Sequence, residues 1–175
     1  ALLKAVELKA QHGGEVVVLT MGPPQARKAL EYCLALGADR AVHLVDRAFA
    51  GSDTLATART LSLALRREGF DLIFCGKCST DAETGQVGPE VAELLGIPQI
   101  TAVHALEIDA AGRLIRAERE TDVGYETVEA PLPALITAAE DLAPERFPTR
   151  KERAEAAEKI IREMTARELS DDLSH

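Results

Sequence analysis

An apolar run, a polar loop and an amphipathic segment follow one another between Phe70 and Leu95, where side chains and backbone could together bind a ligand. Leu72–Cys75 is short, apolar and ended by Gly76, which is typical of a strand covered on both faces. Apolar residues then recur at helical spacing from Val87 to Leu95. The stretch therefore predicts a buried strand, a loop and a helix.

The loop between that strand and helix, residues 76–88, is longer than the usual connection of about 2 to 6 residues. Its glycines and small side chains let backbone N–H groups approach a ligand, and the start of the next helix carries a partial positive charge. The pattern favours a phosphate-binding loop. A solvated surface loop is the alternative that these residues alone leave open.

Cys75 and Cys78 form a C-x-x-C pair within this stretch. Zinc would need two further ligands at suitable spacing, and the four histidines of the chain are scattered. A redox dithiol usually lies at the start of a helix, whereas Cys75 ends a strand well before the next helix. We therefore interpret both thiols as incidental and expect neither a catalytic residue nor a metal site.

Strands and helices alternate through the first half of the chain, as in β-α-β units built on a parallel sheet. The predicted strands are Glu15–Thr20 and Arg40–Val45, and the predicted helices are Ala1–Gln11, Gln25–Leu36 and one from the Ser52-Asp53-Thr54 capping signal to Glu68. Open sheets of this kind bind ligands at the carboxyl ends of their strands. The candidate segments there are Met21–Gly22, Asp46–Thr54 and Gly76–Gly88.

After Pro98 the pattern changes to alternating strands. We predict extended segments at Gln99–Ile108, Leu114–Glu120 and Glu126–Ala130, which form an antiparallel hairpin, and a buried strand at Leu135–Ala138. The proline-containing stretch 139–149 reads as a linker. Lys151–Leu169 is predicted to be one charged helix with a thin apolar seam at Ala154, Ala157, Ile161 and Met164, either a solvated tail or an arm that packs on another chain. The domain division is then 1–143, a nucleotide-binding α/β domain, and 144–175, a linker and helical arm for partner contact.

The bulk properties of the 175 residues narrow the function. A net charge of −9 argues against a nucleic-acid partner, and no apolar run approaches the length of a membrane span. No signal peptide is visible, so we expect a cytoplasmic protein. The helical pattern is already under way at Ala1, without a capping residue ahead of it. We therefore expect that Ala1 lies in the middle of an element, because the chain is trimmed, processed or given incompletely.

Three segments in order resemble the beta subunit of electron transfer flavoproteins. They are Leu36–Ala41 after Met21-Gly22-Pro23, then Gly76–Pro89, and then Ala117–Val128 followed by Pro133–Thr137. In the third, Val123 stands where that family usually has a glycine or an acidic residue. The resemblance covers about Ala1 to Phe147.

This resemblance implies an α/β fold with a doubly wound, mostly parallel sheet of the adenine-nucleotide-hydrolase-like (Rossmann-like) type, an antiparallel hairpin and a C-terminal helical arm. Such a beta subunit forms a heterodimer with an electron transfer flavoprotein alpha subunit that carries FAD. The heterodimer shuttles electrons between a flavin dehydrogenase and a downstream acceptor. It implies an electron carrier rather than a catalyst acting through its own side chains, because the flavin supplies the chemistry.

The resemblance also bears on the bound nucleotide, which is AMP in ordinary members and a second FAD in electron-bifurcating members. The short loop Asp81–Pro89 and the segment Asp46–Thr57 are similar to those of bifurcating and related anaerobic members. Hydroxyls of Thr54 and Thr57 near a second helix start would add donors for a pyrophosphate. We therefore expect FAD, with AMP as the alternative occupant of the same site.

The expected cofactor-binding residues follow from the matching positions. They are Met21 and Gly22 at the adenosine; Ser52, Asp53, Thr54 and Thr57 at the helix start; Gly76, Lys77 and Asp81 at the loop opening; and Thr84, Gly85, Gln86 and Val87 in the phosphate cradle. Each has a structural alternative, such as a cap, a turn or a surface side chain.

Two departures from the family pattern matter. The opening strand of family members is not found ahead of Ala1, and Arg150 stands where their recognition loop carries an apolar anchor. The second departure argues against docking to a standard acyl-CoA dehydrogenase. The competing reading is an adenine-nucleotide-binding regulatory module without redox function. A hydrolase or transferase is disfavoured, because no Walker loop, nucleophile elbow or paired histidine and carboxylate is visible.

Overall fold

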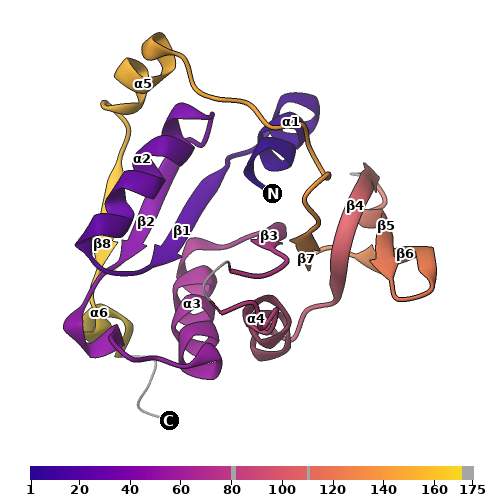
Figure 1. Ribbon diagram of the computed structural model, residues 1–175, viewed down its shortest axis with the longest axis horizontal. Coiled ribbons are helices and arrows are strands. Elements are labelled where there is room, and N and C mark those ends of the chain that lie inside the picture. Colours follow the sequence, from indigo (N-terminus) through magenta and orange to yellow (C-terminus); the bar gives the residue numbers. More distant parts are fainter. Residues whose placement is uncertain (80–81, 110, 171–175) are drawn as a thin grey trace. The chain divides into compact units, whose positions relative to one another are not determined.

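The computed structural model describes residues 1–79, 82–109 and 111–170, which form two compact units, each with its own sheet (Figure 1). One unit holds residues 2–64 together with the chain from Glu145 onward, and the other holds residues 65–144. We refer to them as the 2–64 unit and the 65–144 unit.

The 2–64 unit is built on a three-stranded parallel sheet. Its strands, in sheet order, are β1 (Val17–Met21), β2 (Arg40–Leu44) and β8 (Ile161–Met164). Its helices are α1 (Leu2–His12), α2 (Arg27–Ala35), α5 (Arg150–Ala156), α6 (Ala166–Ser170) and the first part of α3 (Thr54–Glu68), with short 3-10 turns η1 (Pro24–Ala26) and η2 (Arg47–Phe49).

The two faces of β2 bury side chains in two different clusters, because successive side chains of a strand point to opposite faces. Ala41 packs with Leu30 of α2 and Ala156 of α5, whereas Val42 packs with Ala64 of α3 and with residues of the C-terminal segment. Helices therefore cover both faces of this sheet, as the doubly wound prediction requires.

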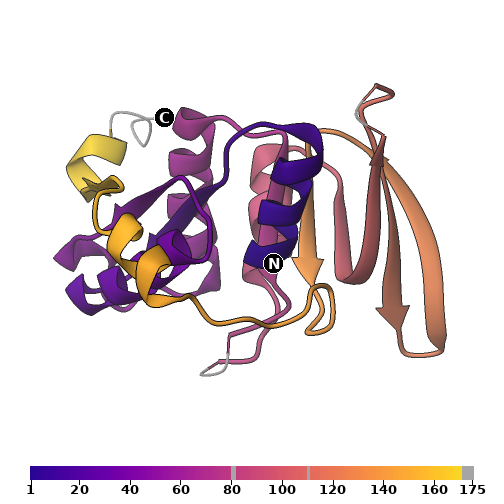
Figure 2. The ribbon, with the colours of Figure 1, turned by 90° about the horizontal axis from the view of Figure 1, so that it is seen from above.

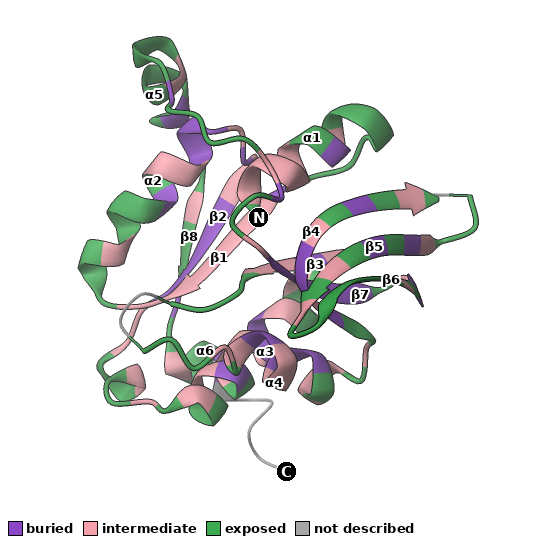
Figure 3. Ribbon diagram, turned by 45° about the vertical axis from the view of Figure 1, so that its right-hand side comes forward, coloured by how far each residue is buried: buried purple, intermediate pink, exposed green. Residues whose placement is uncertain are grey.

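The 65–144 unit contains a mixed five-stranded sheet and helix α4 (Val87–Leu95). Its strands, in sheet order, are β3 (Leu72–Gly76), β7 (Ala134–Ala138), β4 (Gln99–Asp109), β5 (Leu114–Thr121) and β6 (Gly124–Pro131). β3, β7 and β4 run parallel, and β4, β5 and β6 form the antiparallel part (Figure 2). All five residues of β7 are buried, whereas β6 is mostly exposed (Figure 3). The predicted α/β class, mostly parallel with an antiparallel hairpin, is confirmed.

β4 changes its pairing direction along its length. Its start is parallel to β7, where Gln99 pairs with Leu135, and its end is antiparallel to β5, with a register shift between Val103 and Ala105. Ala102 lies in a second register shift, between Ile100 and Val103 in the pairing with β7; it has a φ of 55°, and its N–H donates to the Thr137 hydroxyl over 2.9 Å. Thr137 thus supplies the hydrogen bond that the broken ladder does not, as β-bulges commonly require.

The predicted elements between Ala1 and Ala138 are confirmed to within about two residues, the usual uncertainty of element ends. Helix α3, for example, begins at Thr54 and ends at Glu68 as the capping signal and apolar pattern predict. Among the described residues, no helix has the length and apolar character needed to cross a membrane.

The continuous helix predicted over Lys151–Leu169 is wrong. The segment forms α5, then β8, then α6, and β8 pairs in parallel with β2. The spacing of three between Ile161 and Met164 suggested one helical face, but on a strand it places the two side chains on opposite faces. Each packs in a different cluster, and Met164 and Leu169 are buried. The segment is therefore part of a sheet and its core, not a charged arm without burial.

Candidate functional site

The described residues of the loop after β3 are mostly exposed. The connection runs from Lys77 to Gln86, and the N–H of Glu83 donates to the Ser79 carbonyl over 2.9 Å. Glu83 and Gly85 adopt left-handed φ angles of 52° and 64°. The expected contact Asp81 lies outside the described residues. The observed connection, residues 77–86, is shorter than the predicted loop of residues 76–88, because Gly76 still belongs to β3 and Val87 and Gly88 already belong to α4.

Helix α4 begins without a side-chain cap. Gln86 occupies the N-cap position, and its side chain makes no capping hydrogen bond. The first N–H groups of a helix have no partner within the helix, and Pro89 in this turn has no N–H at all. The amides of Val87 and Gly88 are therefore the donors at this end, where the helix dipole favours an anion.

Gly88 allows α4 to approach the sheet closely. A Cβ at this position would lie 2.8 Å from Cγ2 of Thr137 on β7 and 3.5 Å from Cβ of Cys75 on β3. No larger side chain fits without a shift, because Thr137 is a buried β-branched residue. Thr137 thus contacts the helix start through its methyl group and the irregularity of β4 through its hydroxyl.

The other expected phosphate-cradle residues lie in or next to this loop, and their role stays a prediction. Gly76, Lys77, Thr84 and Gln86 are exposed, and Gly85 and Val87 are half-buried. The Lys77 ammonium lies 3.6 Å from the Glu120 carboxylate, and both side chains are more than half exposed. An exposed pair of this kind contributes little free energy, so it does not prevent Lys77 from binding a phosphate.

Met21 and Gly22 end β1 in the 2–64 unit, and both backbone groups of Gly22 are already engaged by β2. The Gly22 N–H donates to the Leu44 carbonyl over 3.1 Å, and Nε2 of the buried His43 lies 3.1 Å from the Gly22 carbonyl oxygen. Since a carbonyl only accepts, Nε2 carries the proton. Both backbone polar groups of Gly22 are therefore already paired within this unit.

The predicted capping signal at the start of α3 is confirmed, and Asp53 is the residue that caps. Its carboxylate accepts from the Ala56 N–H over 2.8 Å, while the Ser52 hydroxyl donates to the Phe49 carbonyl over 2.8 Å. The expected residues Thr54 and Thr57 lie in this first turn and are half-buried. A negative charge already lies at this helix start, so it suits a phosphate less well than the start of α4 does.

Cys75 and Cys78 differ in environment. Burial raises the pKa of the Cys75 thiol to about 11, so it is protonated at neutral pH and a poor nucleophile. Cys78 is exposed. In the described ranges no group of three or more histidine, cysteine, aspartate or glutamate side chains could hold a metal ion.

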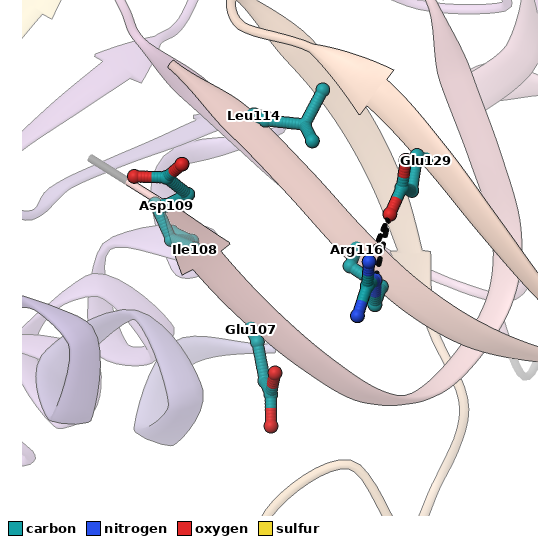
Figure 4. A pocket seen from close by; sticks show the side chains of 6 residues that line it. All are labelled: Glu107, Ile108, Asp109, Leu114, Arg116 and Glu129. Atoms are coloured by element: carbon teal, nitrogen blue, oxygen red, sulfur yellow. Dashed lines mark hydrogen bonds and ion pairs between the residues drawn. The ribbon is translucent and has the colours of Figure 1, made fainter. Parts of the chain in front are cut away.

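A shallow hollow lies elsewhere, on the exposed face of β4, β5 and β6 (Figure 4). It is lined by Glu107, Ile108, Asp109, Leu114, Arg116 and Glu129. Arg116 binds Glu129, and this hydrogen bond is the main reason that the pKa of the guanidinium is raised. None of the expected cofactor residues lies there, and its polar groups are largely paired.

Sequence reasoning missed three residues that shape these positions: His43, Gly88 and Thr137. Their signals were present but weak. A histidine between apolar residues in a strand and a threonine inside an apolar strand both indicate a buried polar group with a specific partner. A glycine in the first turn of a helix indicates a close backbone approach.

The architecture defines a class, that of doubly wound α/β proteins with a loop and an uncapped helix start at the carboxyl end of a parallel strand. Comparison with known proteins narrows the class. Residues 1–169 match the model of the electron transfer flavoprotein domain, and the chain belongs to this family.

Three relatives illustrate the similarity. The electron transfer flavoprotein subunit beta of Clostridium acetobutylicum is 42% identical over 172 residues, which is 98% of this chain and 66% of the relative. Protein FixA of Azorhizobium caulinodans is 49% identical over 146 residues, 80% of this chain and 52% of the relative. The acryloyl-CoA reductase electron transfer subunit gamma of Anaerotignum propionicum is 42% identical over 146 residues, which is 82% of this chain and 54% of the relative. The chain thus spans about half to two thirds of the length of these relatives.

Proposed function

We propose that this chain is the beta subunit of an electron transfer flavoprotein, which moves electrons between a flavin dehydrogenase and a downstream acceptor as a heterodimer with an FAD-bearing alpha subunit. The family match over residues 1–169 carries the proposal, and the relatives named for electron transfer support it. The flavin supplies the redox chemistry, and the side chains bind and orient it. The carrier is therefore not a catalyst by its own side chains.

We also propose that the chain binds an adenine nucleotide with a phosphate at the start of α4. The uncapped first turn, the close approach at Gly88 and the exposed loop before it fit a phosphate group. In the 65–144 unit the proposed contacts are Gly76, Lys77, Asp81, Thr84, Gly85, Gln86 and Val87. In the 2–64 unit they are Met21, Gly22, Ser52, Asp53, Thr54 and Thr57.

FAD is the proposed occupant because the segments Asp46–Thr57 and Asp81–Pro89 resemble those of bifurcating members. The cap at Asp53 weakens the physical argument for a pyrophosphate, since it occupies the second helix start with a carboxylate. AMP, which has one phosphate, is the alternative that this cap favours.

A cofactor count on the chain coexpressed with its proposed alpha subunit tests these statements. The purified complex is denatured, and released FAD and AMP are quantified per heterodimer by chromatography. Two FAD and no AMP support the bifurcating assignment, whereas one FAD and one AMP make this chain a structural half. A stable chain that binds AMP without any flavin or partner would contradict the carrier function and favour a regulatory module.

A further inference from the structure

Asp46 connects two segments that lie far apart in the sequence. It follows β2, and its Oδ1 accepts from the Ala48 N–H over 3.0 Å while its Oδ2 accepts from the Ala166 N–H of α6 over 3.1 Å. Hydrogen bonds from the Ala48 and Ala166 amides lower the pKa of Asp46. One carboxylate therefore holds the start of η2 and the start of α6 together.

Residues 46–53 connect Asp46 to the start of α3, so the position of Asp46 influences that helix start. The Phe49 N–H donates to the Asp46 carbonyl over 3.2 Å, and the Phe49 carbonyl in turn accepts from the backbone N–H and the hydroxyl of Ser52. Asp53, the next residue, caps α3. Hydrogen bonds thus connect Asp46 to Phe49 and Phe49 to Ser52, and the next peptide bond leads to Asp53 at the helix start where four cofactor contacts are proposed.

The C-terminal segment supports the same loop by packing. The Phe49 side chain packs against the cluster that contains Met164 and Leu169, and the Val45 N–H donates to the Met164 carbonyl over 3.0 Å. The backbone pairing, the Asp46 carboxylate and this apolar contact all tie residues 45–49 to residues 164–169. The shape of the loop therefore depends on a segment that the sequence presents as a separate arm.

We propose that Asp46 is a positioning residue of the nucleotide site and that the C-terminal segment, through the Ala166 amide, sets the affinity of that site. The proposal rests on the nucleotide-binding function proposed above. Asp46 itself contacts no ligand. It orients Ser52, Asp53, Thr54 and Thr57. A partner that displaced α6 would therefore change the nucleotide affinity of the site.

Ala166→Pro is the most selective variant, because Ala166 is the first residue of α6. Proline is well tolerated at this position and removes only the N–H that Asp46 binds. Arg150→Pro, at the first position of α5 after an extended N-cap residue, is the matched control. Asp46→Ala and Asp46→Asn form a second pair, since Asn keeps one acceptor for the Ala48 amide. Asp109→Ala, which removes a similar local bond to Gly112 in the 65–144 unit, is their control.

The dissociation constants of AMP and of FAD are measured by titration calorimetry on the dialysed protein, purified with its partner subunit, and melting temperatures are measured in parallel. We expect Ala166→Pro and Asp46→Ala to weaken binding about threefold to tenfold, with Asp46→Asn in between and both controls unchanged. The melting temperature of Ala166→Pro should lie only slightly below that of Arg150→Pro, because the first variant loses one hydrogen bond to Asp46.

Two other outcomes have distinct meanings. Unchanged affinity in Ala166→Pro and Asp46→Ala, in a protein whose wild type binds nucleotide, would overturn the positioning role. A wild-type protein that binds neither AMP nor FAD would instead overturn the proposed nucleotide-binding function.

Discussion

Thr137 and Gly88 set the position of the α4 start through one contact. The threonine methyl fills the space that a Cβ on residue 88 would need, and its hydroxyl is held by the Ala102 amide, so it cannot easily rotate away. The distance between helix and sheet is thus determined by the missing Cβ at Gly88 and the side chain of Thr137.

Gly88→Ala should lower the free energy of unfolding by about 1–2 kcal/mol, since the overlap with Thr137 outweighs the gain in helix propensity. Thr137→Ser removes the methyl group and keeps the hydroxyl. The double variant Gly88→Ala/Thr137→Ser should therefore be more stable than the sum of the single changes predicts, with a coupling of about 1 kcal/mol in denaturant unfolding. Strict additivity would contradict this contact.

Asp39 should make stability depend on pH. Burial raises the pKa of this carboxyl, but hydrogen bonds from Lys9, at 2.5 Å, and from the Val16 N–H, at 2.8 Å, together with the charges of Lys9 and Lys159, lower it overall. A lowered folded-state pKa contributes stability above the unfolded value of about 3.9, and this contribution is lost as the pH falls through the folded value.

The check is the free energy of unfolding of the wild type and of Asp39→Asn between about pH 3 and pH 6. The difference between the two proteins should be largest near pH 6 and should shrink toward pH 3. Parallel curves across this range would show that the Asp39 charge contributes nothing to folding.

For single residues, the sequence predicts local roles better than it predicts contacts with residues far along the chain. The capping role of Asp53 could be predicted, because an N-cap is local and depends on a few neighbouring residues. The contact of Gly88 with Thr137 and the bond of His43 to Gly22 could not, because each joins residues far apart in the chain. Such pairs are defined only once the sheet register is known.

Among the elements, the end of α2 depends on a side chain from the C-terminal segment. The Lys159 ammonium donates to the Leu34 carbonyl over 3.0 Å and to the Ala38 carbonyl over 2.6 Å. The last carbonyls of a helix lack partners within it, and a cation there also interacts favourably with the helix dipole.

Lys159→Met should therefore destabilise the protein by about 1–3 kcal/mol, because two carbonyls lose a charged donor. Lys151→Met is the control, since its side chain is 85% exposed and lies 3.8 Å from its partner Glu155. The control should change the free energy of unfolding by no more than about 0.5 kcal/mol. Equal effects of the two variants in urea unfolding would contradict the capping role.

The start of α3 offers a test of phosphate placement. Asp53→Asn keeps a good cap and removes the charge. If FAD places its second phosphate at this helix start, FAD affinity should rise about twofold to fivefold, because repulsion between carboxylate and phosphate is removed. AMP, whose one phosphate is proposed to lie at the start of α4, should bind with nearly unchanged affinity. A loss of affinity would show that the nucleotide needs the Asp53 carboxylate itself as an acceptor.

The elements that sequence reasoning predicted well are those whose apolar period matches their environment. β1, β2, β3 and β7 are short apolar runs, and α3 has both a cap and a regular stripe. The C-terminal segment was mispredicted because a four-residue strand such as β8 is too short to show a period of two. Its charged neighbours dominated the pattern, and its pairing with β2 is a tertiary effect.

At the scale of the whole molecule, the pairing of β8 with β2 makes the segment after the proposed division at residues 143 and 144 part of the first sheet. The chain from Glu145 onward groups with residues 2–64, and it supplies a strand and the buried apolar side chains of Ala156, Met164 and Leu169 to their sheet and core. A role in partner contact stays a proposal. The segment proposed for partner contact also contributes to the sheet and core of its own unit.

A fragment ending at Pro144 should therefore fold poorly or not at all. Loss of β8 exposes the edge of β2, and loss of Met164 and Leu169 uncovers Val42 and Leu44. We expect low solubility and no cooperative thermal transition, whereas the full chain should show one. A soluble fragment with an unchanged melting temperature would restore the view of a dispensable tail.

The two sheets differ in how their edges are protected against self-association. β6, at one edge of its sheet, carries Glu126, Glu129 and a terminal Pro131, which discourage further strands from pairing. β1, at the edge of the three-stranded sheet, reads Val-Val-Leu-Thr-Met and has neither a charge nor a proline. Short uncharged segments of this kind are templates for cross-β stacking. Within this sheet, Val17–Met21 is therefore the strand whose residue types most favour cross-β stacking.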